Sequence, residues 1–577
     1  MVLLFSWRDR QIIGMRRFTL QVFLAVLVML TMTVNAAEVD AGSLQQQIDR
    51  SQVFKLPRPG MPSLSAPVES KPRSGLKVMV SRFELRGNSV LADDKLRPVL
   101  ALYEGRELSF QEMEEVVLKV AEVFRQAGWT IQAYLPEQNV TDGVVAIQVV
   151  PARLGKIVVD GEVPAPATTG SLSSIIEKHQ HRGDLLNSQI VDRALLIAND
   201  ISGVYINGNL QEGELEGETD VVLKATQKSR IEGNAVWDNT GSRGTGAHRL
   251  AFNAGINNVA TPGDQVSANL IETKGSRYTR LGWTVPVGVE GWRVGANVSH
   301  LSYAVLQFQD SVAPTGTSTT KGVEANYPLV RSKSRNLYVS LAWDEKHFAN
   351  YSTGILKSDY STRLQTFSLY GNSMDDWGGG GANTASLNFV SGQLNLDNSP
   401  NASDIATTTQ TAGSFRKIRY ALNRQQVLTS NWSLFGGISG QHAMASKNLD
   451  SSEKFYLGGS AGVRAYPSSE AGGSYGVMTN LELRWQVNQR VVLGSFYDAG
   501  YVVLYPSKNL QDITALNQYT LRGGGLSMAW EISEGASWKV TMSRRIGQNP
   551  AASLETGNDL DGSLVKTRIW SSLSVSF

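Results

Sequence analysis

From about residue 228 to Phe577, the sequence consists of segments of about ten residues in which polar and apolar side chains alternate. Turn-forming Gly, Asn, Asp, Ser and Pro residues separate these segments. In VMTNLELRWQV (477–487), Leu481, Leu483 and Trp485 share one face of a strand, whereas Glu482 and Arg484 lie on the other. One face suits lipid and the other suits water. The sequence therefore predicts that residues 228–577 form a transmembrane β-barrel.

A count of these segments predicts about sixteen antiparallel strands, within an error of two, and a barrel of that size encloses an aqueous lumen. The last segment, IWSSLSVSF, ends on Phe577. A terminal aromatic residue in the last strand resembles the C-terminal signal of bacterial outer-membrane proteins. The alternative is an array of soluble β-sandwiches, against which Phe577 and the N-terminal segment both argue.

Residues 1–36 have the layout of a secretory signal peptide. Four arginines precede the apolar run FTLQVFLAVLVMLTMTV, and small residues around Ala36 follow it. The alternative is a membrane anchor, but the run contains polar residues and barely reaches the length of a spanning helix. No comparable apolar run occurs downstream. A mature chain that spans a membrane would therefore have to do so as a closed barrel.

Residues 37–76 predict a short polar helix at about 43–52, followed by a linker rich in Pro and Ser. A linker of this kind is extended enough for the helix to reach and plug the barrel. The alternative is a disordered terminus.

Residues 77–227 contain two consecutive units, 77–152 and 153–227, each with strands and helices in a similar order. In the first unit, Ser109 and Glu112 form a capping box ahead of a helix. In the second, Asn187 is a helix cap, and an apolar face of Ile190, Ala194, Ile197 and Ile201 follows it. The pattern predicts internal duplication of a small α+β domain.

Composition excludes several classes of function. The chain has no cysteine, which rules out disulfide scaffolds, thiolate nucleophiles and cysteine-ligated metals. Its net charge of +2 provides no basic footprint for nucleic acid. The sequence has no phosphate-binding G-x-x-x-x-G-K-[ST] loop. We expect no cofactor and no nucleic-acid partner.

Two short motifs could indicate a catalytic site or a metal site. GGSAG (458–462) matches G-x-S-x-G, but a nucleophile elbow needs a strand-to-helix turn, and no helix follows here. His179 and His181 could hold a metal, but a polar loop between helices explains them better. We therefore expect neither a catalytic site nor a metal site.

The segment FYLGGSAGVRAYPSSEAGGSYG (455–476) is the candidate functional loop, because its Arg464 is framed by Val463 and Tyr466. In the next strands, parity places Glu482, Phe496 and Asp498 on the inner face of the barrel. A loop folded into the lumen could pair Arg464 with Asp498 or Glu482. The alternative is an exposed extracellular loop whose arginine contacts nothing.

LGGSAGVRAYP, the E-L-R-W strand and the F-Y-D-A-G strand together resemble the transporters of two-partner secretion systems, of the haemolysin secretion and activation type in the Omp85 superfamily. The resemblance covers the whole chain. It implies a signal peptide, a plug helix, a linker, two periplasmic POTRA domains and a sixteen-stranded barrel. The family motif V-R-G-[YF] corresponds to residues 463–466, with Ala465 in place of the usual glycine and Ser474 in place of a later acidic residue. By resemblance, Arg464 and Asp498 hold the loop against the barrel wall.

The resemblance implies an outer-membrane pore of a Gram-negative bacterium that binds an unfolded exoprotein through its POTRA domains and exports it. The exoprotein would be a haemolysin, an adhesin or a contact-dependent toxin, and a haemolysin would also be activated. By the same resemblance, outer-membrane lipid would surround the pore, and the barrel assembly machinery and periplasmic chaperones would act during its biogenesis. The alternatives are an assembly factor that inserts other barrels, and a passive porin, which has no reason to carry two periplasmic domains.

Overall fold

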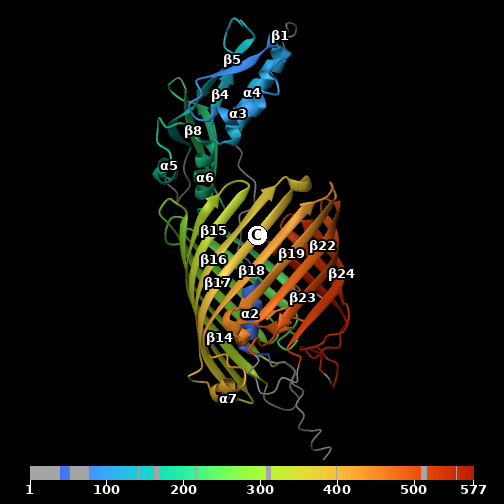
Figure 1. Ribbon diagram of the computed structural model, residues 1–577. Coiled ribbons are helices and arrows are strands. Elements are labelled where there is room, and N and C mark those ends of the chain that lie inside the picture. Colours follow the sequence, from blue (N-terminus) through green and yellow to red (C-terminus); the bar gives the residue numbers. More distant parts are fainter. Residues whose placement is uncertain are drawn as a thin grey trace, which may run out of the picture.

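The structure is a computed structural model that describes residues 39–51, 77–140, 142–161, 169–215, 217–306, 313–397, 399–507, 516–553 and 555–577. Figure 1 shows a barrel with two small α+β units stacked at one end. The predicted signal peptide (1–36) and most of the predicted linker lie outside the described residues. Among the helices of the described part, none is both long and apolar enough to cross a membrane.

Sixteen antiparallel strands form the closed barrel, in chain order around the wall, and β26 pairs with β9 to complete it. The predicted barrel and its strand number are confirmed. The strands are β9 (Ile231–Asp238), β10 (Arg249–Asn257), β11 (Gln265–Glu272), β12 (Ser276–Val287), β13 (Trp292–Ala304), β14 (Thr315–Arg331), β15 (Arg335–Ser352), β16 (Ile355–Asp375), β17 (Gly381–Asn395), β18 (Gly413–Val427), β19 (Trp432–Ala443), β22 (Tyr475–Asn488), β23 (Val491–Val503), β24 (Gln518–Ser533), β25 (Ala536–Arg545) and β26 (Thr567–Ser576).

The alternation of side chains along each strand sorts the two faces of the wall. On β22, Leu481, Leu483 and Trp485 are exposed on the outside, whereas Met478 and Glu482 are buried inside. An apolar exterior is stable only against lipid, since water would leave this large apolar surface unfavourably hydrated. Short connections include η1 (Trp377–Gly379) and α7 (Ala402–Thr407).

The first α+β unit comprises β1 (Lys77–Val80), β2 (Arg82–Arg86), α3 (Asp93–Leu100), β3 (Arg106–Ser109), α4 (Phe110–Gln126), β4 (Ile131–Tyr134) and β5 (Val144–Pro151). Its main sheet has the order β2-β5-β4, and β1 pairs with β3. The capping box of Ser109 and Glu112 is present at the start of α4. The helix buries Val116, Val120 and Phe124 against the sheet.

The second unit comprises β6 (Arg153–Asp160), α5 (Thr169–Glu177), α6 (Ser188–Asn199), β7 (Val204–Glu212) and β8 (Glu218–Gln227), with sheet order β6-β8-β7. Asn187 caps α6 as predicted. The predicted helical face is too narrow, because α6 also buries Val191, Leu195, Leu196 and Ala198 between the sheet and α5. Ile190 and Ile201 are only half-buried.

Ion pairs join the second unit to the barrel. The guanidinium of Arg331, at the end of β14, donates to both carboxylate oxygens of Asp200 at 2.8 Å. Lys333 donates to Asp192 on α6 at 2.7 Å. These contacts set the orientation of the second unit over the barrel mouth.

Candidate functional site

Residues 444–474, between β19 and β22, form a long loop that folds back into the barrel, and we call it the lumen loop. It contains η2 (Met444–Ser446), η3 (Ser451–Glu453), β20 (Phe455–Tyr456) and β21 (Gly472–Gly473), and the two short strands pair with each other. Beyond them the chain doubles back tightly, so that the amide of Val463 donates to the carbonyl of Leu457 at 2.7 Å. A Cβ on Gly462 would lie 2.0 Å from that carbonyl oxygen, which explains the glycine.

Arg464 lies at the tip of the lumen loop and binds two carboxylates of the barrel wall. Its guanidinium donates to both oxygens of Asp498 on β23, at 2.9 and 2.8 Å, and to Glu482 on β22 at 2.8 Å. The guanidinium also lies 3.4 Å from the ring centroid of Phe496. The side chain of Asp498 is fully buried and that of Arg464 is 12% exposed. Planar, bidentate pairing of this kind is the strongest form of ion pair that an arginine makes.

The backbone of Arg464 is held as well. Its amide donates to Asp498 at 3.1 Å, and its carbonyl accepts hydrogen bonds from Ser543 Oγ on β25 at 2.6 Å and from Trp570 Nε1 on β26 at 2.7 Å. One residue of the loop therefore touches strands β22, β23, β25 and β26 on one side of the wall. Sequence reasoning named Asp498 and Glu482 but missed Ser543 and Trp570, which give no signal except inward parity.

The neighbours of Arg464 pack against the wall. Val463, Ala465 and Tyr466 are all fully buried, in a cluster with Val502 on β23 and Leu521 on β24. A Cβ on Gly523 would lie 2.5 Å from the Cβ of Ala465. Ala465 therefore fits because the facing wall residue is itself a glycine.

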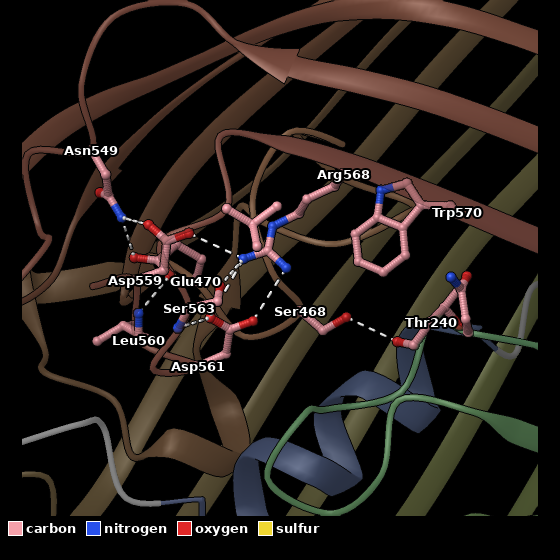
Figure 2. Close-up of polar contacts among 12 residues, drawn as sticks. Thr240, Ser468, Glu470, Asn549, Asp559, Leu560, Asp561, Ser563, Arg568 and Trp570 are labelled. Carbon is pink, nitrogen blue, oxygen red and sulfur yellow. Dashed lines mark hydrogen bonds and ion pairs between the residues drawn. The ribbon is translucent and has the colours of Figure 1, made fainter. Parts of the chain in front are cut away.

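A second set of contacts, which we call the Asp559 cluster, holds the lumen loop further along (Figure 2). Glu470 accepts hydrogen bonds from Asn549 Nδ2 and from the amide of Leu560, both at 3.0 Å. Asn549 also donates to Asp559, which binds Arg568 at 3.0 Å and Arg545. Sequence reasoning missed this cluster, whose only local signal is a lone acidic residue in a glycine-rich loop.

The lumen loop thus spans the junction at which the barrel closes. Glu470 contacts the connection between β25 and β26, and Ser468 Oγ donates to the carbonyl of Thr240, just after β9, at 3.0 Å (Figure 2). The hydroxyl of Ser474 accepts a hydrogen bond from the amide of Leu449 and donates one to the carbonyl of Leu504.

Glu470 should make the docking of the lumen loop depend on pH. Burial, with repulsion from Asp559, raises the pKa of Glu470 to about 7, above its ordinary value of 4.5. The docked loop therefore binds more protons than a released one between these values, and docking weakens as the pH rises through about 7. We expect a lower unfolding temperature at pH 8 than at pH 6, and Glu470→Gln should reduce this difference. An unchanged difference in that variant would assign it to other groups.

The short helix α2 (Ala41–Ser51) lies inside the barrel (Figure 1). Its apolar residues Ala41, Leu44 and Ile48 pack against aromatic side chains of the inner wall. Asp49 accepts from Lys346 on β15 at 2.7 Å, and Lys346 is only 9% exposed. Three other side chains of the helix contact the lumen loop: Gln46 with the carbonyl of Ser452, Gln47 with Ser469, and Arg50 with the carbonyl of Tyr456. The helix and the lumen loop therefore lie together in the lumen.

Reversing the charge of Asp49 should expel α2. In Asp49→Lys, a second cation would face buried Lys346, so we expect single-channel conductance to increase several-fold in planar bilayers as the lumen opens. The double reversal Asp49→Lys with Lys346→Asp should restore low conductance. Glu122→Lys, on the exposed face of α4, is the matched control. Unchanged conductance in Asp49→Lys would show that α2 does not limit ion flow.

The remaining predicted residues lie apart from the lumen loop. Phe577 extends the closing strand pair, since its amide and carbonyl both bind Gly233 at 3.0 Å, while its ring is 67% exposed. His179 and His181 lie in the turn after α5. Throughout the described ranges, no group of three or more His, Asp or Glu side chains is placed to hold a metal ion. GGSAG (458–462) lies in the turn of the lumen loop, without a following helix.

Comparisons with known proteins agree with this architecture. Residues 217–530 match the family model of the haemolysin secretion/activation protein ShlB/FhaC/HecB, and residues 78–152 match the POTRA domain, ShlB-type. The heme/hemopexin transporter protein HuxB of Haemophilus influenzae is 23% identical over 522 residues, which cover 87% of this chain and 90% of HuxB. The outer membrane transporter CdiB of Dickeya dadantii is 22% identical over 428 residues, covering 71% and 73% of the two chains.

Solved structures show the same fold. CdiB from Escherichia coli superposes with a TM-score of 0.66 at 19% identity, over 94% of this chain and all of CdiB. BamA from Haemophilus ducreyi, lacking its first three POTRA domains, gives a TM-score of 0.51 at 13% identity, over 87% and 100% of the chains. With more than half of its length matched by one family model, the chain belongs to the ShlB/FhaC/HecB family of haemolysin secretion/activation proteins, the outer-membrane transporters of two-partner secretion.

Proposed function

We propose that this transporter captures one large exoprotein in the periplasm in unfolded form and passes it through its own barrel lumen to the cell surface. The observation that carries the proposal is the way the lumen is filled. The strands close the barrel without help from α2 or the lumen loop, and both are held to the wall by ion pairs, hydrogen bonds and apolar packing of side chains. A path through the barrel can therefore open without breaking a strand pair.

Capture would take place on the two α+β units, which we take to be POTRA domains spanning 77–152 and 153–227. Each main sheet has two edge strands, including β4 and β6, and among the described residues only the start of β6 is covered on its outer side, by residues 183–185. These edges carry exposed Tyr134 and Val158 beside unpaired backbone groups. An extended segment of exoprotein can add to such an edge as a further strand.

We propose that the protein is not an enzyme, and that folding of the exoprotein outside the cell drives its movement. We also propose that the barrel assembly machinery and periplasmic chaperones act on this chain during biogenesis. In this account, a haemolysin cargo would be activated as it emerges.

Deleting residues 77–227 should abolish export and leave the barrel inserted. The experiment co-expresses the transporter with a large exoprotein that it exports and measures the amount of that exoprotein in the medium. Barrel folding is checked by the heat-dependent shift in electrophoretic mobility that folded barrels show. A second variant, Asp200→Ala, keeps both sheets but removes the ion-pair partner of Arg331. It should export at a reduced rate, between those of the deletion variant and the unmodified protein. Normal export by the deletion variant would disprove capture by these units.

A further inference from the structure

The outer face of β15 to β18 changes character along its length. Nearer the α+β units, an apolar band includes outward-facing Leu341, Trp343, Phe367 and Phe389, all between 39% and 57% exposed. The chain leaves the second α+β unit at β9, so β15 runs away from the periplasm and its C-terminal half lies toward the cell exterior (Figure 1). The apolar band ends there, at Trp343, and polar residues follow it.

Just beyond the apolar band, one hollow on this face is lined by Trp343 together with three basic side chains, those of Arg363, Arg416 and Lys447. Arg363 and Arg416 occupy the same outward parity as Phe367 and Phe389. Lys447 belongs to the lumen loop where it leaves β19 at the rim. The hollow therefore opens toward the membrane, at the depth of the headgroups of the outer leaflet.

The charges in this hollow are only partly balanced. Arg363 pairs with Glu345 at 2.9 Å, and the ammonium of Lys447 donates to the carbonyls of Gln410 and Ala412. Arg416 has no hydrogen-bond or ion-pair partner among the described residues and is exposed. Together the three cations and Glu345 leave an excess positive charge beside an aromatic surface.

The opposite end of the same strand provides the contrast. Arg424, near the periplasmic end of β18, binds both oxygens of Asp375 at 2.7 and 2.9 Å, and also Asn383 and Gln426. Arg424 is therefore an outward-facing arginine whose hydrogen-bond donors are taken up by other residues of the protein. Arg416 has no such partners among the described residues.

We infer that this hollow binds a phosphorylated lipid of the outer leaflet. Its headgroup phosphate would pair with Arg416 and Arg363, since planar guanidinium groups bind phosphate oxygens two at a time. Its acyl chains would lie on the apolar band of Trp343, Phe367 and Phe389, which adjoins the hollow that holds the headgroup. A soluble anion would use the arginines but not the apolar band, and a soluble protein could not reach a surface that faces the bilayer.

The test measures lipid binding to the purified full-length protein by native mass spectrometry. The probes are lipid A with both phosphates, the same lipid without phosphates, and inorganic phosphate. The variant is Arg363→Gln with Arg416→Gln, and the matched control is Arg335→Gln at the periplasmic end of β15, which removes an outward charge outside the hollow.

The double variant should bind the bisphosphorylated lipid about thirtyfold more weakly, as expected for losing two solvent-exposed charge pairs, while Arg335→Gln changes binding by less than about twofold. Removing the phosphates from the lipid should weaken binding to the unmodified protein by a similar factor. Trp343→Ala should weaken lipid binding with both arginines in place. Equal binding of both lipids, equal binding by the double variant, or occupancy by inorganic phosphate that displaces the lipid would each overturn the inference.

Discussion

Replacing Arg464 with alanine should reduce secretion at least about tenfold while the barrel stays folded and inserted, because a buried pair that loses one partner typically costs about 3 to 5 kcal/mol. The substitution removes the guanidinium from Asp498, which is fully buried, and from Glu482, which is 10% exposed. Both carboxylates then remain on the wall without their main partner. The strand pairs of the barrel do not depend on Arg464, so the substitution weakens the attachment of the lumen loop to the wall and leaves the barrel intact.

Three further variants sharpen this prediction. Asp498→Ala should behave like Arg464→Ala, and the double variant should be no worse than either, since both act through one contact. Arg484→Ala is the matched control, because Arg484 also binds Glu482, at 3.3 Å, but its side chain is 29% exposed. It should secrete within about twofold of the unmodified protein. Additive losses in the double variant would contradict a shared contact.

Asp559→Ala should have the second largest effect, because it removes the carboxylate that two nearly buried arginines share. The Asp559 side chain is fully buried, and its partners Arg545 and Arg568 are only 7% and 12% exposed. We expect a loss of about 3 to 5 kcal/mol in the local stability of the Asp559 cluster. The connection between β25 and β26 should then separate from Glu470 and become sensitive to protease added outside the cell.

The measurement is the rate at which residues 546–566 are cleaved in intact cells, compared with Asp561→Ala as a control. Asp561 binds only Arg568 among the arginines of this cluster and should show a smaller increase in cleavage. Secretion should fall less in Asp559→Ala than in Arg464→Ala, because Arg464 would still hold the tip. Equal cleavage of the two aspartate variants would show that Asp559 does not organise the cluster.

Much of this architecture could be predicted from the sequence, because a strand that separates lipid from water must alternate strictly. That alternation places Glu482 and Asp498 inside and Leu481 outside without any knowledge of the fold. The helix caps at Ser109 and Asn187 were equally visible, since a capping side chain and the amide it accepts from lie within three residues of each other.

The contacts between distant segments could not be predicted in the same way. Glu470 meets Asn549 and Leu560 only because the lumen loop folds back to the barrel's closing strands. The contact between Gln46 and the carbonyl of Ser452 likewise joins segments 406 residues apart. Alternation fixes which face a side chain occupies, but the height and angle at which a loop descends depend on packing. The small residues Gly523 and Ala465 allow the loop to lie close to the wall. The sequence alone does not show that these two residues face each other.

The position of the lumen loop can be measured directly, because the chain has no natural cysteine. Val463→Cys introduces a thiol of similar size at a fully buried position beside Arg464, and Ser403→Cys introduces an exposed one on α7 at the cell exterior. In intact cells, a membrane-impermeant maleimide should label Ser403→Cys quickly and leave Val463→Cys unlabelled. Adding Asp498→Ala should make Val463→Cys reactive, because the loop is then released from the wall. Rapid labelling of Val463→Cys with Asp498 in place would show that the loop lies outside the barrel and would contradict the account.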